Sequence, residues 1–420
     1  MPADLRILIV AEHASLRFGG EAALPLHVFI GLRKRGGDCW MIVHARTRPE
    51  LQQRLGADIA RVIFIEDDWF HRLMWRLGKV LPAKLGYHST GFLSRLRTQL
   101  TARRRAKDLI ASVGIDIIHQ PIPVSPKEPS VLAGLGVPVV MGPMNGNMTY
   151  PPGLTNRSSA RAVSGRLLDG ARFLSDMLHH LMPGKKSASL LLVANERTRL
   201  ALPSMIRGKV AELVENGVDP ELWQPRREDR HRPADSLEVV FMGRLVDWKR
   251  VDLAIGALAA LPHLPQVRLT VIGDGPERER LAAIATAAGT GHRVTFAGWR
   301  EQSEAARMVA NADCLILPSV FECGGAVVLE AMSIGLPVIA TAWGGPLDYI
   351  TPETGVLVEP TSEAALLAGF AQAMERFARD PALVRRMGNA GRRRVLDHFT
   401  WPSKIDAIQR HYRDVINQRD

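Results

Sequence analysis

The fold is decided by one stretch in the last third of the chain, which reads FECGGAVVLEAMSIGLPVI over residues 321–339. An apolar run over residues 314–318 precedes it and has the composition of a buried strand. Gly324-Gly325 then allows a sharp turn and the close approach of a ligand. The helix that follows presents unpaired N–H groups at its first turn, and it ends at Gly335-Leu336-Pro337 because proline cannot continue a helix. The stretch therefore predicts a strand–turn–helix–strand unit of a parallel α/β domain.

Two carboxylates flank the first turns of this helix. Glu322 precedes the helix and Glu330 lies about two turns further on. Carboxylates accept hydrogen bonds from sugar hydroxyls, and backbone amides at a helix start donate to phosphate. The stretch therefore favours a ligand that is both a polyol and a phosphate. The alternative is that Glu322 is a solvated loop residue and Glu330 a surface charge.

This stretch resembles the E-x7-E signature of family-4 glycosyltransferases, which have the GT-B fold and retain the anomeric configuration of the donor sugar. The similarity continues through Gly344-Gly345 and through residues 355–358. At residue 324 the chain departs from the family, because Gly324 stands where an aromatic residue is usual. The resemblance implies an α/β protein with two Rossmann-like, doubly wound parallel-sheet domains that face each other across a cleft.

The length and composition agree with two domains. A chain of 420 residues is too long for one hydrophobic core. It contains no run of eighteen apolar residues, and its first residues enter an apolar strand without the pattern of a signal peptide. The three cysteines lack paired spacing, which indicates reduced thiols in the cytoplasm and no zinc site. The net charge of +11 favours anionic partners.

The resemblance also implies the domain boundaries. We expect an acceptor domain over residues 1–205, which a C-terminal helix from about 403 to 420 rejoins. We expect the nucleotide-sugar donor domain over residues 206–402.

Two cations follow the first strand of the second domain. That strand covers residues 237–241, and Gly243 then permits a turn that carries Arg244 and, five residues later, Lys249. Arginine can fork onto two phosphate oxygens, whereas lysine acts as a point charge. Surface salt bridges are the alternative. In the resembled family a Gly-Arg pair and a lysine at this spacing hold the donor diphosphate, so we predict that role for Gly243, Arg244 and Lys249.

The first domain contributes weaker candidates. Gly19-Gly20 follows the first strand but lacks the G-x-G-x-x-G spacing of a dinucleotide site, and a simple tight turn is equally compatible with it. The resemblance places this glycine pair against the donor diphosphate. His119 ends a buried strand, at the edge where parallel sheets bind ligands. It matches the first member of a His-x-His pair in the family, with Pro121 at the second, so we take His119 as a catalytic candidate.

A basic segment over residues 69–107 contains no acidic residue. Its lysines and arginines alternate with tryptophan and leucine, a composition typical of segments that lie on an anionic membrane. The alternative is a solvated helix whose apolar stripe packs on its own domain. We expect this segment to make a peripheral contact with the inner face of the membrane.

Together these features predict a retaining glycosyltransferase that moves a sugar from a UDP- or GDP-linked donor to a hydroxyl of a lipid-linked or growing surface glycan. Arg244 and Lys249 would stabilise the leaving diphosphate. Glu322 would orient the sugar and Glu330 would bind the ribose. The backbone at Gly324, Gly325, Ala326 and Val327 would face the phosphates.

We predict no metal or other cofactor, because no Asp-x-Asp motif is present and the two cations can replace a metal ion. The alternatives are a GT-B sugar-nucleotide epimerase and a non-catalytic glycan-binding module. We predict no nucleic-acid partner, because the basic residues form no known DNA- or RNA-binding motif.

Overall fold

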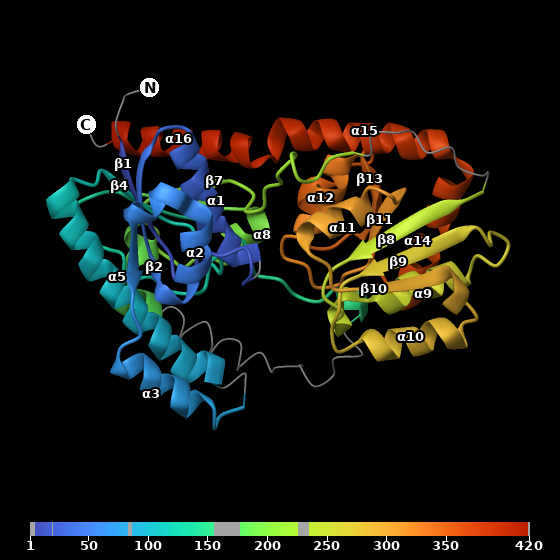
Figure 1. Ribbon diagram of the computed structural model, residues 1–420, viewed down its shortest axis with the longest axis horizontal. Coiled ribbons are helices and arrows are strands. Elements are labelled where there is room, and N and C mark those ends of the chain that lie inside the picture. Colours follow the sequence, from blue (N-terminus) through green and yellow to red (C-terminus); the bar gives the residue numbers. More distant parts are fainter. Residues whose placement is uncertain (1–4, 19, 83–85, 155–176, 226–234, 419–420) are drawn as a thin grey trace. The chain divides into compact units, whose positions relative to one another are not determined.

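The structure, a computed structural model, describes residues 5–18, 20–82, 86–154, 177–225 and 235–418 (Figure 1). These residues form two units. The first contains the described residues up to Asn147, those from 177 to Glu215, and those from Ile405 onward. The second contains Met148 to Leu154 and the described residues between Asn216 and Lys404.

The described part of the first unit builds a seven-stranded parallel sheet in the order β3-β2-β1-β4-β5-β6-β7. Its central strands are near-continuous apolar runs, as expected for a parallel sheet that is covered on both faces. The strands are β1 (Arg6–Val10), β2 (Asp38–His44), β3 (Val62–Ile65), β4 (Ile117–Gln120), β5 (Val139–Met144), β6 (Leu190–Val193) and β7 (Lys209–Glu212).

Two hydrophobic cores flank this sheet. One joins Phe29 of α1 to Ile405 and Tyr412 of α16, and the other joins Ala102 and Ala106 of α5 to the opposite face of the strands. The sheet is therefore doubly wound. The helices of this unit are α1 (Gly20–Lys34), η1 (Ala45–Thr47), α2 (Arg48–Leu55), η2 (Gly56–Arg61), α3 (Trp69–Gly78), η3 (Tyr87–Gly91), α5 (Phe92–Val113), α7 (Gly184–Ser187), α8 (Glu196–Arg199) and, from Ile405 on, α16 (Trp401–Asn417).

The described part of the second unit builds a six-stranded parallel sheet in the order β10-β9-β8-β11-β12-β13. The strands are β8 (Leu237–Met242), β9 (Val267–Ile272), β10 (Val294–Gly298), β11 (Cys314–Leu317), β12 (Val338–Thr341) and β13 (Gly355–Val358). The helices are η5 (Asp247–Lys249), α9 (Val251–Ala259), α10 (Arg278–Ala287), η6 (Gly291–Arg293), α11 (Gln302–Val309), α12 (Ala326–Ile334), α13 (Pro346–Tyr349), α14 (Glu363–Arg379) and α15 (Pro381–His398).

Both sheets reverse their strand order next to the first strand. The reversal lies between β1 and β4 in the first unit and between β8 and β11 in the second. In open α/β sheets, ligands bind outside the carboxyl ends of the strands at this switch point. The structure thus confirms two Rossmann-like parallel-sheet domains and points to two sheet edges as binding positions.

The division between the units differs from the predicted boundary at residues 205/206. Residues 206–215 belong to the first unit because β7 pairs with β6 along its whole length. Met148 to Leu154 belong to the second unit, where Thr149 O accepts a hydrogen bond from Trp343 Nε1 at 2.7 Å. Among the described residues, no helix combines the length and the apolarity that crossing a bilayer requires.

Candidate functional site

The switch point of the second unit brings together a predicted lysine and a predicted glutamate. Lys249 lies in η5, after β8, and Glu322 follows β11. The two strands are parallel neighbours, so the loops after them meet at one sheet edge. Lys249 Nζ donates a hydrogen bond to Glu322 Oε2, and the two side chains are only 15% and 14% exposed. This ion pair is largely screened from water.

Glycine geometry positions Glu322. Gly325 caps α12 with a left-handed φ of +75°, and a Cβ there would lie 3.2 Å from Glu322 Cγ. Gly345 N donates to Glu322 O at 2.8 Å, and a Cβ on Gly345 would lie 2.1 Å from Gly324 O. The loop after β12 therefore packs tightly against the backbone that carries Glu322. The predicted donor-binding residues Gly324, Ala326 and Val327 lie at this helix start, whose first amides have no intrahelical acceptor.

Arg244 lies in the same β8–α9 connection as Lys249 and is exposed. Among the described residues, nothing pairs with its guanidinium. Its neighbour Gly243 packs against the next loop, since a Cβ on Gly273 would lie 1.9 Å from Gly243 O. Arg244 is thus a free cation on a backbone that packing holds in place.

Arg250 is held differently from Arg244. It has a left-handed φ of +49°, a conformation that side chains with a Cβ rarely adopt. Its guanidinium forms ion pairs with Asp252 and Glu363, both at 3.1 Å. These contacts hold the Arg250 side chain in place and neutralise its charge within the unit.

Glu330 lies on α12, on the same helix that Glu322 precedes. It is partly buried, and desolvation raises its pKa to about 7. No contact among the described residues joins it to Lys249 or Glu322. Its predicted role at the ribose stays a prediction.

His119 has a structural environment. Its side chain is fully buried, Nε2 donates to Gly142 O at 2.6 Å, and Nδ1 accepts from the Tyr412 hydroxyl at 2.6 Å. Burial lowers the pKa of His119 to about 4, so the ring is neutral near pH 7. Both nitrogens are used to join β4 to β5 and α16. We therefore assign no catalytic role to His119.

The glycine pair after β1 is described in part. Gly19 lies outside the described residues, and Gly20 is the exposed first residue of α1, where a Cβ would meet nothing within 4 Å. The preceding turn is anchored by the buried Glu50, which accepts hydrogen bonds from Ser15 Oγ at 2.5 Å and from Leu16 N at 2.9 Å. The predicted contact of Gly19-Gly20 with a donor stays a prediction.

One aromatic contact beside the site was not foreseen. The ring of Tyr150 lies 5.1 Å from that of Phe321, at an interplanar angle of 31°. Phe321 directly precedes Glu322, so Tyr150 borders the candidate site. Tyr150 lies within the predicted first domain, residues 1–205. No local pattern indicates that its segment belongs to the second unit.

One group in the described residues has the composition of a metal site. Ligand atoms of His44, Asp67 and His71 lie within 4.8 Å of one another. However, His44 Nδ1 accepts from Arg46 N at 3.2 Å, and both nitrogens of His71 are occupied, by Asp68 Oδ1 at 2.7 Å and Thr98 Oγ1 at 3.0 Å. These hydrogen bonds cap η1 and α3, so we assign the group a structural role.

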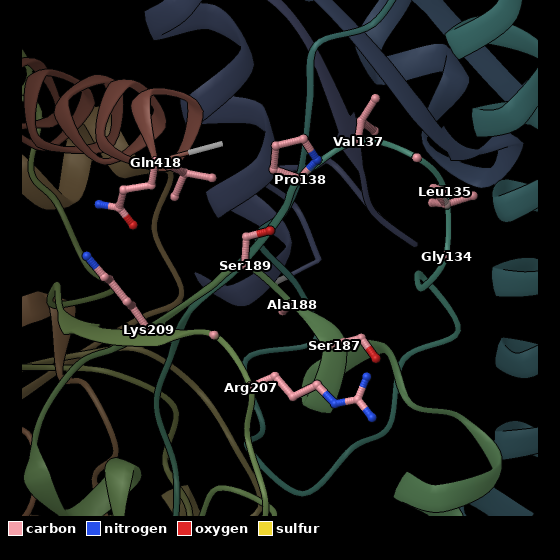
Figure 2. Close-up of a pocket in the computed structure, with 13 residues that line it drawn as sticks. Gly134, Leu135, Val137, Pro138, Ser187, Ala188, Ser189, Arg207, Lys209 and Gln418 are labelled. Carbon is pink, nitrogen blue, oxygen red and sulfur yellow. The ribbon is translucent and has the colours of Figure 1, made fainter. Parts of the chain in front are cut away.

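A cavity of about 550 Å³ lies in the first unit, at the opposite sheet edge from the switch point (Figure 2). Pro138 and Ser189, which line it, directly precede β5 and β6. Arg207 and Lys209 add two cations, but Figure 2 shows their side chains extending in different directions. The cavity contains none of the predicted site residues.

The two parallel-sheet Rossmann-like units form a GT-B fold. Residues 224–394, which belong to the second unit, match the family model of glycosyl transferases group 1. The lipopolysaccharide core biosynthesis glycosyltransferase LpsE of Rhizobium meliloti is 35% identical over 176 residues, which are 42% of this chain and 49% of that protein. Glycogen synthase of Mycobacterium tuberculosis is 32% identical over 203 residues, 48% of this chain and 47% of the relative.

The chain thus spans about half the length of the curated relatives that it matches. Solved structures cover it almost completely. Sucrose-phosphate synthase from Thermosynechococcus elongatus superposes with a TM-score of 0.64 at 20% identity, over 98% of this chain and 100% of that one. HepE from Anabaena in complex with UDP superposes with a TM-score of 0.66 at 17% identity, over 97% and 100%. At these identities the likeness shows the GT-B fold.

Proposed function

We propose that this protein is a retaining glycosyltransferase that transfers a sugar from a nucleotide diphosphate sugar to a hydroxyl acceptor. The observation that carries the proposal is the Lys249–Glu322 ion pair at the switch point of the second unit. The free cation Arg244 and the amino terminus of α12 belong to the same sheet edge. This edge offers two cations, one carboxylate and a set of backbone donors to one ligand.

The roles follow from charge. As the bond between the sugar and the diphosphate breaks, negative charge grows on the leaving group, and preoriented cations stabilise it. Arg244 and Lys249 supply those cations without a metal ion. Lys249 exchanges its bond to Glu322 for the diphosphate, which leaves the Glu322 carboxylate to accept hydrogen bonds from sugar hydroxyls. Glu330 binds the ribose. No protein nucleophile is assigned.

The relatives support a donor and an acceptor class. The HepE structure contains bound UDP, and LpsE is named for lipopolysaccharide core biosynthesis. We therefore propose a UDP- or GDP-linked donor, and an acceptor that is a lipid-linked or growing surface glycan.

Nucleotide sugars will stabilise the folded protein. A ligand that binds only the native state adds about 2.7 kcal/mol at a hundredfold excess over its dissociation constant. In a thermal-shift panel without divalent metal, we expect one or two UDP- or GDP-sugars to raise the unfolding temperature, and Lys249→Ala to abolish the shift. The control is Arg385→Ala, which removes an exposed cation of α15 and should preserve the thermal shift. A folded protein that responds to no nucleotide sugar contradicts the proposal. If the protein converts the donor to an epimer when no acceptor is present, it is an epimerase. If it binds the donor but does not turn it over, it is a glycan-binding module.

We also propose that α3 contacts the inner face of an anionic membrane, in a cytoplasmic protein. The helix exposes Trp69 by 66% and Trp75 by 62%, and Leu73 and Leu77 are exposed as well. Only His71 and Met74 of this helix are buried. These four apolar side chains face outward, which supports a membrane contact over packing on their own unit. By contrast, α5 buries Thr98, Ala102 and Ala106, so the proposed contact is narrower than residues 69–107.

Removal of the two tryptophans will weaken vesicle binding. In co-sedimentation with vesicles that contain phosphatidylserine, Trp69→Ser/Trp75→Ser should lower the partition by about tenfold or more, because each large apolar side chain contributes roughly 1.5–3 kcal/mol when fully buried. Wild-type binding should fall with salt, since each nearby cation contributes about 1 kcal/mol. Trp299→Ser is the matched control, because Trp299 is 66% exposed in the second unit. Equal binding to neutral vesicles, or an unaffected double variant, argues against the contact.

A further inference from the structure

A second cavity lies beside the Lys249–Glu322 pair, within the second unit. It has a volume of about 290 Å³. Asp247 and Trp248 of η5 line it, whereas Lys249 of the same short helix turns to Glu322. The cavity and the proposed diphosphate site therefore share η5 and use different sides of it.

Aromatic and aliphatic side chains form half of the lining of this cavity. Trp248 is 37% exposed and presents part of its indole to solvent. The half-buried Tyr150 contacts the ring of Phe321, and the Trp343–Thr149 hydrogen bond holds its segment in place. Leu154 and Val320 are buried and add an apolar surface.

The polar groups of the cavity favour a neutral ligand. Glu277 Oε2 accepts from Arg280 Nε at 2.6 Å, and Asp247 adds a second carboxylate. The guanidinium of Arg250 is already paired with Asp252 and Glu363 outside the lining. Both guanidinium groups of the lining, Arg250 and Arg280, are paired with carboxylates, and this pairing disfavours a phosphate. These polar side chains suit hydroxyl groups, which donate to carboxylates and accept from arginine.

We propose that this cavity binds one pyranose unit of a saccharide, separately from the nucleotide. The C–H face of the sugar packs on Trp248 and Tyr150, and its hydroxyls bond to Asp247, Glu277 and Arg280. The proposal rests on the proposed function only for the source of the saccharide, which is the glycan that carries the acceptor hydroxyl.

Saturation-transfer NMR on the full chain tests this site. The probes are the methyl α-pyranosides of glucose, galactose and mannose, each with and without saturating UDP. We expect transfer to ring C–H protons of at least one glycoside, with no change when UDP is present. Trp248→Ala should weaken that binding about tenfold, as the loss of an aromatic contact implies. Trp299→Ala, which removes an exposed indole outside the cavity, should leave it unchanged.

A second variant separates loss of glycoside binding from loss of folding. Glu277→Gln keeps the shape of the side chain, removes its charge, and should weaken the glycoside several-fold while the unfolding temperature stays close to that of the wild type. The proposal is overturned if no glycoside binds, if UDP displaces the glycoside, or if Trp248→Ala binds as the wild type does. Nucleotide-sugar stabilisation without glycoside binding overturns this site alone. Glycoside binding without any nucleotide response supports the site and contradicts the transferase proposal.

Discussion

Lys249→Met should lower the rate of sugar transfer by about 100- to 1,000-fold, the range observed when a preoriented group that stabilises transition-state charge is removed. Methionine keeps the length and the apolar stem of the side chain but has no charge. Because Lys249 is only 15% exposed, water replaces its charge poorly. The loss should therefore fall on kcat as well as on KM, since the diphosphate carries more negative charge in the transition state than in the bound donor.

The measurement is steady-state transfer with the donor found by thermal shift. The comparison set is Lys249→Met, Glu322→Gln, the double variant and the control Arg385→Ala. Each single change at the ion pair leaves one charge partly buried and unpaired, whereas the double change removes both, so its stability should recover relative to Lys249→Met. Activity should not recover. If the double variant regains activity together with stability, Lys249 only positions Glu322 and does not stabilise the leaving group.

The local part of the site could be predicted from the sequence. The expected strand, glycine turn, helix and strand are β11, the Gly324-Gly325 turn, α12 and β12. Each rests on short-range rules: Gly325 adopts a left-handed conformation that favours glycine, and Gly335 does the same at the helix end before Pro337. The meeting of Lys249 with Glu322 follows once the strand order places β8 next to β11.

Long-range contacts could not be predicted in this way. His119 looked like a ligand because it ends a strand at the correct edge, yet its ring faces Tyr412, which comes from the last helix of the chain. Tyr150 borders the site because its segment belongs to the second unit, where Thr149 O accepts a hydrogen bond from Trp343 Nε1. Neither outcome has a signal in the local pattern, since each depends on which distant residue fills the space beside it.

The basic segment shows the same limit. Residues 69–107 read as one amphipathic stretch, but α3 exposes its tryptophans while α5 packs on the sheet. A composition rich in tryptophan and arginine describes both helices. Only the burial of Ala102 and Ala106 separates the packed helix from the exposed one.

Gly345→Ala should damage the site, although it adds a single methyl group. A Cβ on Gly345 would lie 2.1 Å from Gly324 O and 2.6 Å from Cys323 O, and contacts below 3.0 Å force a shift. Both obstacles are backbone atoms, so no side chain can rotate away. The shift moves the backbone that carries Glu322 and the amino terminus of α12.

We expect Gly345→Ala to destabilise the protein by about 1–3 kcal/mol, as overpacking does, and to weaken UDP binding at least tenfold, because the hydrogen bond from Gly345 N to Glu322 O is displaced as well. Thermal unfolding and a UDP titration measure the two effects. Gly291→Ala is the matched control, since its Cβ would make only ordinary contacts at 3.8 Å to Thr286. If Gly345→Ala binds UDP as tightly as Gly291→Ala does, the backbone around Glu322 does not set the geometry for the nucleotide. The ligand would then have to be held by Arg244 and Lys249 alone, which a further loss of affinity in Arg244→Ala on the Gly345→Ala background would show.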